Sequence, residues 1–246
     1  MSRRVRRALI VQQEASEGPF AVGAALQAAG FELDVRHPYA GDPLPADTGS
    51  HDALVILGGP MAAYSDDRFA WRGDELRVVA AAVAAGTPTL GICLGAQILA
   101  HACGGRAVRG PQLEIGWLPV RLTGAAGRDS LFTGLPEEWT VLQWHGDTVE
   151  LPPGAELLAS NDRYPHQAFR LGPHAWGVQF HIEVDQLAVP RFCEGSSEQA
   201  DAAADGGVAR ILADAPAVLA ALAPTRDEFL RRFAARAVET SVVRPV

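Results

Sequence analysis

The strongest constraint on the fold is a cysteine between two glycines, where a predicted strand turns into a predicted helix. Residues 89–92 form a short apolar run, and residues 94–103 carry apolar side chains at helical spacing around Cys93, Gly91 and Gly95. Gly-x-Cys-x-Gly is the spacing of a nucleophile elbow, whose tight turn leaves no room for β-carbons at the flanking positions. A thiol at a helix N-terminus is also favoured as the thiolate. The alternative is a buried structural cysteine, so a nucleophile would need a base and an oxyanion hole elsewhere.

Strand and helix patterns alternate along the first half of the chain. Strands are predicted at 7–12, 31–36, 53–57 and 89–92, and helices within 18–30, 74–85 and 94–103. This order predicts an α/β fold with a flavodoxin-like, doubly wound, mostly parallel central sheet flanked by helices. Short runs joined by Gly/Pro turns then predict a small antiparallel extension, at 106–108, 115–122, 140–144, 156–160, 167–170 and 176–180.

Length and composition favour one large α/β domain, alone or with an appendage. The chain has 246 residues, of which 48% are apolar and 25 are glycine. We expect residues 1–185 to form the domain that carries the elbow. Residues 186–246 are rich in alanine and predict a helical C-terminal extension packed on the same domain, with a packing or assembly role rather than a catalytic one.

Charge and residue usage exclude several classes of function. The net charge of −8 argues against nucleic-acid and membrane-surface partners, and no run is expected to reach transmembrane length. The three cysteines, at 93, 103 and 193, form no metal or disulfide pattern, which favours a reducing cytoplasm. All 21 basic residues are arginine, so a P-loop lysine and a Schiff-base lysine are both absent. No cofactor and no metal is expected.

A cysteine nucleophile needs a base, and two of the seven histidines are candidates, His145 and His181. If the last strand continues to residue 183, His181 and Glu183 point to the same side of it. Glu183 could then hold one nitrogen of the imidazole and leave the other for the thiol. A surface His–Glu pair at a strand end is the alternative. The combination with the elbow favours His181.

An oxyanion hole needs backbone N–H groups that converge on the developing charge. One candidate is the N–H of Leu94, directly after the nucleophile. The other is the sequence Gly58-Gly59-Pro60 at the end of a predicted strand, where glycine permits close backbone approach. Without Cys93, a plain tight turn would be the first interpretation of these glycines.

Three motifs together resemble one family. Residues 58–60, 91–97 and 179–183 match, in order and spacing, the class I (triad) glutamine amidotransferases, and in particular their stand-alone GMP-synthase-like domains. The resemblance covers residues 7 to 185. It implies that Cys93 attacks the side-chain amide of glutamine, His181 transfers the proton and Glu183 orients His181. A γ-glutamyl thioester would form, ammonia would leave, and water would release glutamate.

The resemblance also implies roles for residues around the nucleophile. The N–H groups of Gly59 and Leu94 would form the oxyanion hole, with Gly58 and Gln97 beside the substrate. The sequence Trp144-His145-Gly146-Asp147 is similar to the family loop that contacts the α-amino and carboxylate ends of the substrate. His145 is therefore expected to serve in substrate binding or structure and not as the base.

The chain departs from the family pattern in two ways. Ile182 stands where the family usually has proline, and the sequence after Glu183 is too short for an ATP-pyrophosphatase module. Ammonia would then pass to a synthetase or acceptor subunit in trans. A γ-glutamyl peptide or γ-glutamyl amine hydrolase with the same triad remains an alternative, as does a non-catalytic regulatory subunit. A related elbow-cysteine family, such as the deglycase/chaperone or catalase-type proteins, would place its histidine differently. The leaving group and the oligomeric state stay open.

Overall fold

The computed structural model describes residues 4–195, 200–201, 203 and 205–243. The description leaves out residues 1–3, 196–199, 202, 204 and 244–246. These parts of the predicted ranges 1–185 and 186–246 therefore lie outside the described residues. The strands are β1 Arg6–Val11, β2 Phe31–Arg36, β3 Ala53–Ile56, β4 Thr89–Ile92, β5 Arg106–Leu122, β6 Glu138–Glu150, β7 Ala155–Ser160, β8 Ala168–Leu171 and β9 Ala175–Val178. The helices are α1 Phe20–Ala28, α2 Arg72–Ala84, α3 Leu94–Ala102, α4 Ala188–Gly195 and α6 Gly207–Val243, with 3-10 turns η1 Pro38–Ala40 and η2 Ala126–Arg128.

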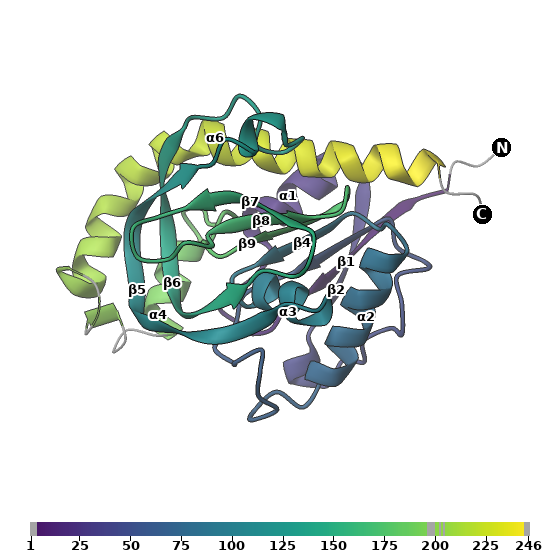
Figure 1. Cartoon of the computed structure of the whole chain (residues 1–246). Coiled ribbons are helices and arrows are strands. Elements are labelled where there is room, and N and C mark those ends of the chain that lie inside the picture. The colour runs from purple at the N-terminus through teal and green to yellow at the C-terminus, as the bar shows by residue number, and fades with distance from the viewer. Residues whose placement is uncertain (1–3, 196–199, 202, 204, 244–246) are drawn as a thin grey trace.

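All nine strands belong to one mixed sheet, ordered β2-β1-β3-β4-β9-β8-β7-β5-β6 (Figure 1). The five strands from β2 to β9 pair in parallel, and the remaining pairs are antiparallel. The α/β prediction is therefore confirmed, but the antiparallel part is not a small extension, because its strands β5 and β6 are the longest of the sheet.

Two predicted short strands, at 106–108 and 115–122, are one strand. Gly110 and Pro111 suggest a break in the sequence, yet the structure runs β5 through them. The pairing of β5 with β6 shifts register between Arg109 and Glu114, as expected for a β-bulge. A bulge absorbs the irregular residues without ending the strand. It also directs this stretch toward the cavity described below.

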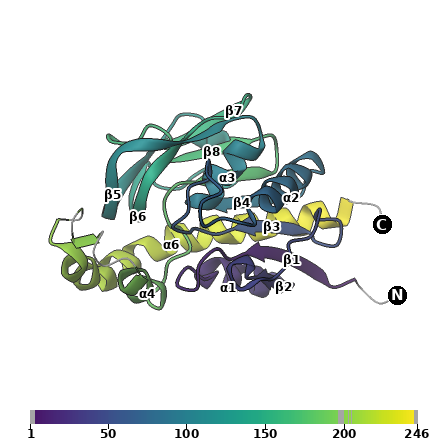
Figure 2. The ribbon, with the colours of Figure 1, turned by 90° about the horizontal axis from the view of Figure 1, so that it is seen from below.

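Side chains of the parallel strands alternate between two cores on opposite faces of the sheet. In β1, Ala8 and Ile10 belong to the core under α1 and α6, whereas Leu9 and Val11 belong to the core under α2 and α3. Figure 2 shows the two helix pairs on either side of the strands. Strands buried on both faces read as continuous apolar runs, which explains why they were visible in the sequence.

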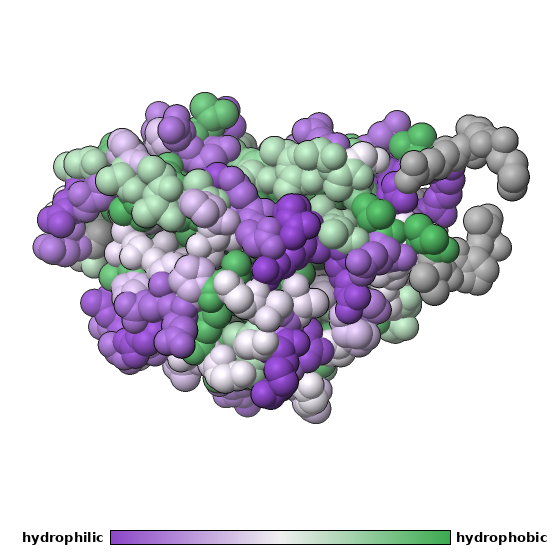
Figure 3. All heavy atoms as spheres, turned by 90° about the horizontal axis from the view of Figure 1, so that it is seen from above, coloured by the Kyte–Doolittle hydropathy of each residue, from purple (hydrophilic) through white to green (hydrophobic). Residues whose placement is uncertain are grey.

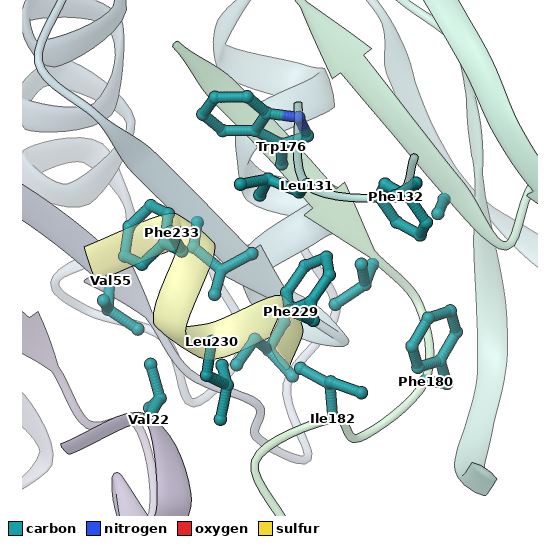
Figure 4. Packing of buried hydrophobic residues seen from close by; sticks show 14 of the residues in the cluster. Val22, Val55, Leu131, Phe132, Trp176, Phe180, Ile182, Phe229, Leu230 and Phe233 are labelled. Atoms are coloured by element: carbon teal, nitrogen blue, oxygen red, sulfur yellow. The ribbon is translucent and has the colours of Figure 1, made fainter. Parts of the chain in front are cut away.

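The C-terminal helix α6 lies along the sheet and contributes to its core. Phe229, Leu230 and Phe233 are buried there and pack near Trp176 and Ile182 (Figure 4). Because Ile182 neighbours both His181 and Glu183 in the chain, α6 supports the turn that carries the predicted base.

By length and composition alone, residues Gly207–Val242 of α6 could cross a membrane, so the expectation that no run reaches that length was wrong. The interior of the helix contains Pro216 and Pro224. Figure 3 shows hydrophilic atoms interrupting the hydrophobic ones on the face that α6 crosses. The buried aromatic side chains Phe229 and Phe233 pack the C-terminal half of α6 against the sheet, whereas only 28% of the apolar window itself is buried.

Candidate active site

Cys93 occupies a strained turn between β4 and α3. Its φ is 51° and its ψ is −110°, a left-handed region that a residue with a β-carbon rarely adopts. The backbone N–H of Cys93 donates to the carbonyl of Val178 at 2.8 Å, which ties the turn to the end of β9. A β-carbon on Gly91 would lie 2.6 Å from the carbonyl carbon of Gly95, so these two glycines are what permit the turn. The elbow geometry matches the sequence prediction.

His181 and Glu183 form a buried pair. His181 Nδ1 lies 2.7 Å from Glu183 Oε1, and both side chains are 1% exposed. The premise of this prediction was wrong in one respect, since β9 ends at Val178 and the residues on either side of His181, 179–180 and 182–183, are bends. An isolated bridge instead holds the turn, with the N–H of His181 donating to the carbonyl of Leu142 at 2.9 Å.

The surroundings of His181 favour its protonated form. Burial alone lowers the pKa of this imidazole, but the charges of Glu183 and Cys93, and hydrogen bonding to both, outweigh burial and raise the pKa well above its ordinary value. The ring of Phe192 from α4 packs edge-on against the imidazole, with centroids 4.6 Å apart. The imidazole is therefore fixed in orientation and placed to exchange a proton with the thiol.

Two residues predicted for the oxyanion hole, Gly59 and Leu94, lie next to each other. A β-carbon on Gly59 would lie 3.2 Å from Leu94 Cδ2, and one on Gly58 would lie 2.9 Å from His181 Cε1. Leu94 is the first residue of α3, so its N–H has no acceptor within the helix. The structure thus brings the glycines after β3 against both the base and the start of α3.

A buried polar cluster that sequence reasoning missed lies behind Gly59. A β-carbon on Gly59 would come within 2.7 Å of Gln13 Cβ. The amide of Gln13 accepts a hydrogen bond from Trp71 Nε1 at 2.7 Å and donates to Glu75. Burial raises the pKa of Glu75 to about 8 despite that hydrogen bond. The cluster fixes the position of the loop that carries Gly59.

Gln97 reaches the nucleophile through a second glutamine. Its Nε2 donates to Gln179 Oε1 at 3.2 Å, and Gln179 Nε2 lies 3.7 Å from Cys93 Sγ. Gln97 also lines the cavity in front of Cys93. Gln179 belonged to the recognised motif but had no assigned role, because a contact across 86 residues leaves no local signal.

Trp144, His145, Gly146 and Asp147 lie on strand β6 and not on a loop, so that expectation was wrong. They still line the cavity in front of Cys93, and the carbonyl of Trp144 lies 3.8 Å from Cys93 Sγ. Trp144, His145 and Asp147 pair with residues of β5, and this pairing explains their extended conformation.

His145 cannot act as the base because both ring nitrogens face acceptors. Nε2 lies 3.0 Å from Glu114 Oε2 and 3.1 Å from Gln143 Oε1, and Nδ1 lies 2.9 Å from the carbonyl of Asp147. Glu114 also accepts from Gln167 at 2.8 Å. This buried network, of which only His145 was singled out from the sequence, holds the cavity wall in place.

A cavity of about 450 Å³ opens in front of Cys93. Its wall includes most of the predicted residues, while Gly58, His181 and Glu183 lie behind it. The lining residues are Glu17, Gly59, Pro60, Met61, Cys93, Leu94, Gln97, Arg109, Gly110, Pro111, Gln112, Leu113, Ile115, Trp144, His145, Gly146 and Asp147.

The cavity carries charges of both signs. Burial raises the pKa of Asp147, opposed by hydrogen bonding to Tyr64 and by the charge of Arg109. An anion beside a cation suits the zwitterionic end of an amino acid. Arg109 was missed because an arginine directly after a predicted strand has no local mark of function. Among the described residues, no group of three His, Cys, Asp or Glu is arranged to hold a metal ion.

Comparisons with known proteins agree with this geometry. The glutamine amidotransferase-like protein YfeJ of Salmonella typhimurium is 32% identical over 178 residues, which is 69% of this chain and 72% of that protein. A glutamine-hydrolyzing GMP synthase of Porphyromonas gingivalis is 37% identical over 150 residues, which is 60% of this chain but only 28% of that protein.

Solved structures give the same result over nearly the whole chain. A glutamine amidotransferase from Thermotoga maritima has a TM-score of 0.84 and 27% identity, covering 94% of this chain and 99% of that one. Another, from Methylobacillus flagellatus, has a TM-score of 0.85 and 30% identity, covering 96% of each. The family pattern described as "Glutamine amidotransferase class-I" matches residues 21–188. The chain therefore belongs to the class-I glutamine amidotransferase family.

Proposed function

We propose that this protein hydrolyses the side-chain amide of glutamine through a γ-glutamyl thioester on Cys93. The observation that carries the proposal is the strained Cys93 elbow, with the buried His181–Glu183 pair beside it and a cavity in front of it. Family membership supports the same reaction class. An intact cysteine, histidine and glutamate set argues against the non-catalytic regulatory subunit.

The reaction would run in two steps. The thiolate of Cys93 attacks the amide carbon, and the oxygen takes the negative charge between the N–H groups of Gly59 and Leu94. The protonated His181 gives its proton to the nitrogen, the C–N bond breaks and ammonia leaves. Water then attacks the thioester, with His181 as base, and releases glutamate and the free thiol. Glu183 keeps its place at Nδ1 throughout, so Nε2 always faces the reacting atoms.

The same cavity would bind the amino-acid end of glutamine. Asp147 and Arg109 supply opposite charges for the α-ammonium and α-carboxylate, and Trp144, Gly146 and Gln97 close the walls. His145 serves by holding Asp147 and β6 in position. A γ-glutamyl peptide or amine would satisfy the same contacts, since these alternatives differ only beyond the scissile bond.

The proposal also covers the fold class, the partner, the domain boundaries and the location of the protein. The parallel strand order β2-β1-β3-β4-β9 supports a flavodoxin-like class for the fold. The chain spans only 28% of the GMP synthase to which it is similar, and that relative supports a synthetase or acceptor subunit in trans as the partner. We retain residues 1–185 as the amidotransferase domain, residues 186–246 as its helical extension, and a cytoplasmic location.

The proposal is tested by incubating the purified protein with glutamine. We expect glutamate and ammonia to appear in equal amounts, measured by a coupled glutamate dehydrogenase assay and by ion chromatography. Acid-quenched samples should carry one γ-glutamyl group on Cys93 by mass spectrometry. A folded protein that releases no glutamate from glutamine would exclude the proposed function, and release from γ-glutamyl amides alone would support the alternative hydrolase.

Replacing Glu183 with glutamine should lower kcat for glutamate release by roughly 10²–10⁴-fold with little change in KM. The amide cannot carry the negative charge that stabilises protonated His181, and its N–H₂ can face Nδ1 and reverse the tautomer. Steady-state kinetics on glutamine measures the effect. Glu150→Gln, at an exposed residue that weakly pairs with Arg106, is the control and should match the wild type. Equal activity of the two variants would remove Glu183 from the triad.

A further inference from the structure

Gln13 joins the two ends of the loop that carries Gly59, which runs from the end of β3 to the start of α2. At the first end, a β-carbon on Gly59 would lie 2.7 Å from Gln13 Cβ and 3.2 Å from Leu94 Cδ2, so this glycine is held between two side chains. At the second end, Trp71 Nε1 donates to Gln13 Oε1 at 2.7 Å. Glu75, in the first turn of α2, accepts from Gln13 Nε2. One side chain therefore fastens both ends of the loop.

The hydrogen bonds through Gln13 run in one direction. An indole N–H can only donate, so the amide oxygen of Gln13 must face Trp71 and the amide N–H₂ must face Glu75. Glu75 is 0% exposed, and its second oxygen, Oε2, is buried without a hydrogen-bond partner among the described residues. A carboxylic acid with its proton on Oε2 suits this place, whereas a carboxylate would be buried with one neutral hydrogen bond.

No cation pairs with Glu75 among the described residues. Arg72, in the first turn of the same helix, donates instead to the carbonyl of Ala63 at 2.5 Å and to Asp66 Oδ1 at 2.9 Å. On the neighbouring helix α3, His101 Nε2 lies 3.2 Å from Arg72 Nη2, and both burial and this guanidinium lower the pKa of the imidazole. Arg72 is therefore turned to other partners, and His101 is held in its neutral form.

Burial consequently decides the protonation of Glu75. It raises the pKa of this carboxyl to about 8, against the opposing hydrogen bond from Gln13. The remaining charged residues of the same stretch of α2, Asp74 and Arg77, are exposed and pair with each other. The carboxyl of Glu75 thus keeps its proton at neutral pH and loses it as the pH rises through about 8.

We propose that Gln13 and Glu75 are positioning residues for the oxyanion step, which hold Gly59 in place only while Glu75 is uncharged. This inference rests on the glutamine hydrolysis proposed above, in which the N–H of Gly59 stabilises the developing negative charge. A charge on Glu75 would draw water in or move the start of α2, and either change displaces Gln13 from Gly59. Neither Gln13 nor Glu75 lines the cavity in front of Cys93, so the effect falls on kcat and not on KM.

The first test removes the acceptor at position 75 and then restores it. Glu75→Leu leaves the N–H₂ of Gln13 unpaired and should lower kcat for glutamine at least about tenfold, with KM changed by less than about twofold. Glu75→Gln offers an amide oxygen in the same place and should return kcat at about pH 7 to within about twofold of the wild type. Asp74→Asn, at the exposed neighbouring residue, is the control and should match the wild type. A folded Glu75→Leu protein with wild-type kcat would overturn the proposal.

The second test is the pH dependence of kcat, which needs no destabilised variant. Glu75 of the wild type ionises as the pH rises through about 8, whereas Glu75→Gln has no proton to lose. Both proteins share the changes that come from His181. The ratio of kcat for Glu75→Gln to kcat for the wild type should therefore stay near one below about pH 7 and reach at least about threefold by about pH 9.5. A purely structural role would leave this ratio independent of pH, and a flat ratio would overturn the proposal.

The outcomes separate this inference from the proposed function. If the wild type releases no glutamate from glutamine at any pH, the proposed function fails and the inference fails with it. If the wild type is active but the ratio stays flat, the inference is wrong and the proposed function stands. If Glu75→Leu does not fold, the ratio alone decides. A higher KM with unchanged kcat in Glu75→Leu would place the effect on substrate binding and would also contradict the inference.

Discussion

Replacing Cys93 with alanine should lower glutamate release from glutamine at least about ten-thousandfold, because it removes the sulfur on which the proposed thioester forms. The remaining groups, His181 and the proposed oxyanion N–H groups of Gly59 and Leu94, could only orient a water molecule. The variant should still bind glutamine, because the cavity wall around Asp147 and Arg109 is unchanged. Initial rates at saturating glutamine, and binding by calorimetry, measure the two effects separately.

The control for this variant is Cys103→Ala. Cys103 is half-buried at the end of α3, where burial raises the pKa of its thiol, so it is neither near the cavity nor prone to ionise. Its loss should change kcat by less than about twofold. Alanine at position 93 also keeps a β-carbon at φ 51°, so the strain of the turn is retained and the melting temperature should change little. Activity retained in Cys93→Ala, or lost equally in Cys103→Ala, would contradict the elbow as the reactive centre.

Local patterns made part of this site visible in the sequence. The glycines around Cys93 are required by backbone contacts within a few residues, so a short motif carries them. A short motif also carries His181 and Glu183, although the chain brings them into contact through bends and not along a strand. Motifs work where the chemistry and the backbone constraint lie close together in the chain.

Contacts between distant segments left no such pattern. Gln179 reaches Cys93 across 86 residues, and Glu114 reaches His145 across 31. Glu17 comes near His181 only because β1 and β9 lie in one sheet with their carboxyl ends together. A glutamate in a loop after a strand looks like any solvated side chain until the fold buries it.

The lack of a local signal for long-range contacts also explains the wrong predictions about the fold. Gly110 and Pro111 are strong local breakers, and only the pairing of β5 with β6 shows that the strand continues past them. The apolar length of α6 satisfies a membrane criterion, and only the contacts of Phe229 and Phe233 with the sheet show that the C-terminal half of the helix belongs to the core. Tertiary pairing decided both cases against the local signal.

Replacing Gly95 with alanine should destabilise the protein by at least about 3 kcal/mol, because two backbone segments meet there. The new β-carbon would overlap the carbonyl oxygen of Ile56 and lie 2.7 Å from its carbonyl carbon. Backbone of a central strand cannot rotate away as a side chain can. The midpoint of urea unfolding, followed by circular dichroism, measures the loss.

Gly73→Ala is the matched control for Gly95→Ala. Gly73 also lies in the first turn of a helix, α2, but nothing lies within 4 Å of its added β-carbon. This change should leave stability unchanged or raise it by about 0.5–1 kcal/mol, since alanine costs less helix entropy than glycine. Any Gly95→Ala protein that folds should also lose activity, because shifting Ile56 moves Gly59, the proposed oxyanion residue three positions later. Equal unfolding midpoints for the two variants would mean that α3 can move away from β3, and that the close approach at Gly95 does not hold Cys93 in place.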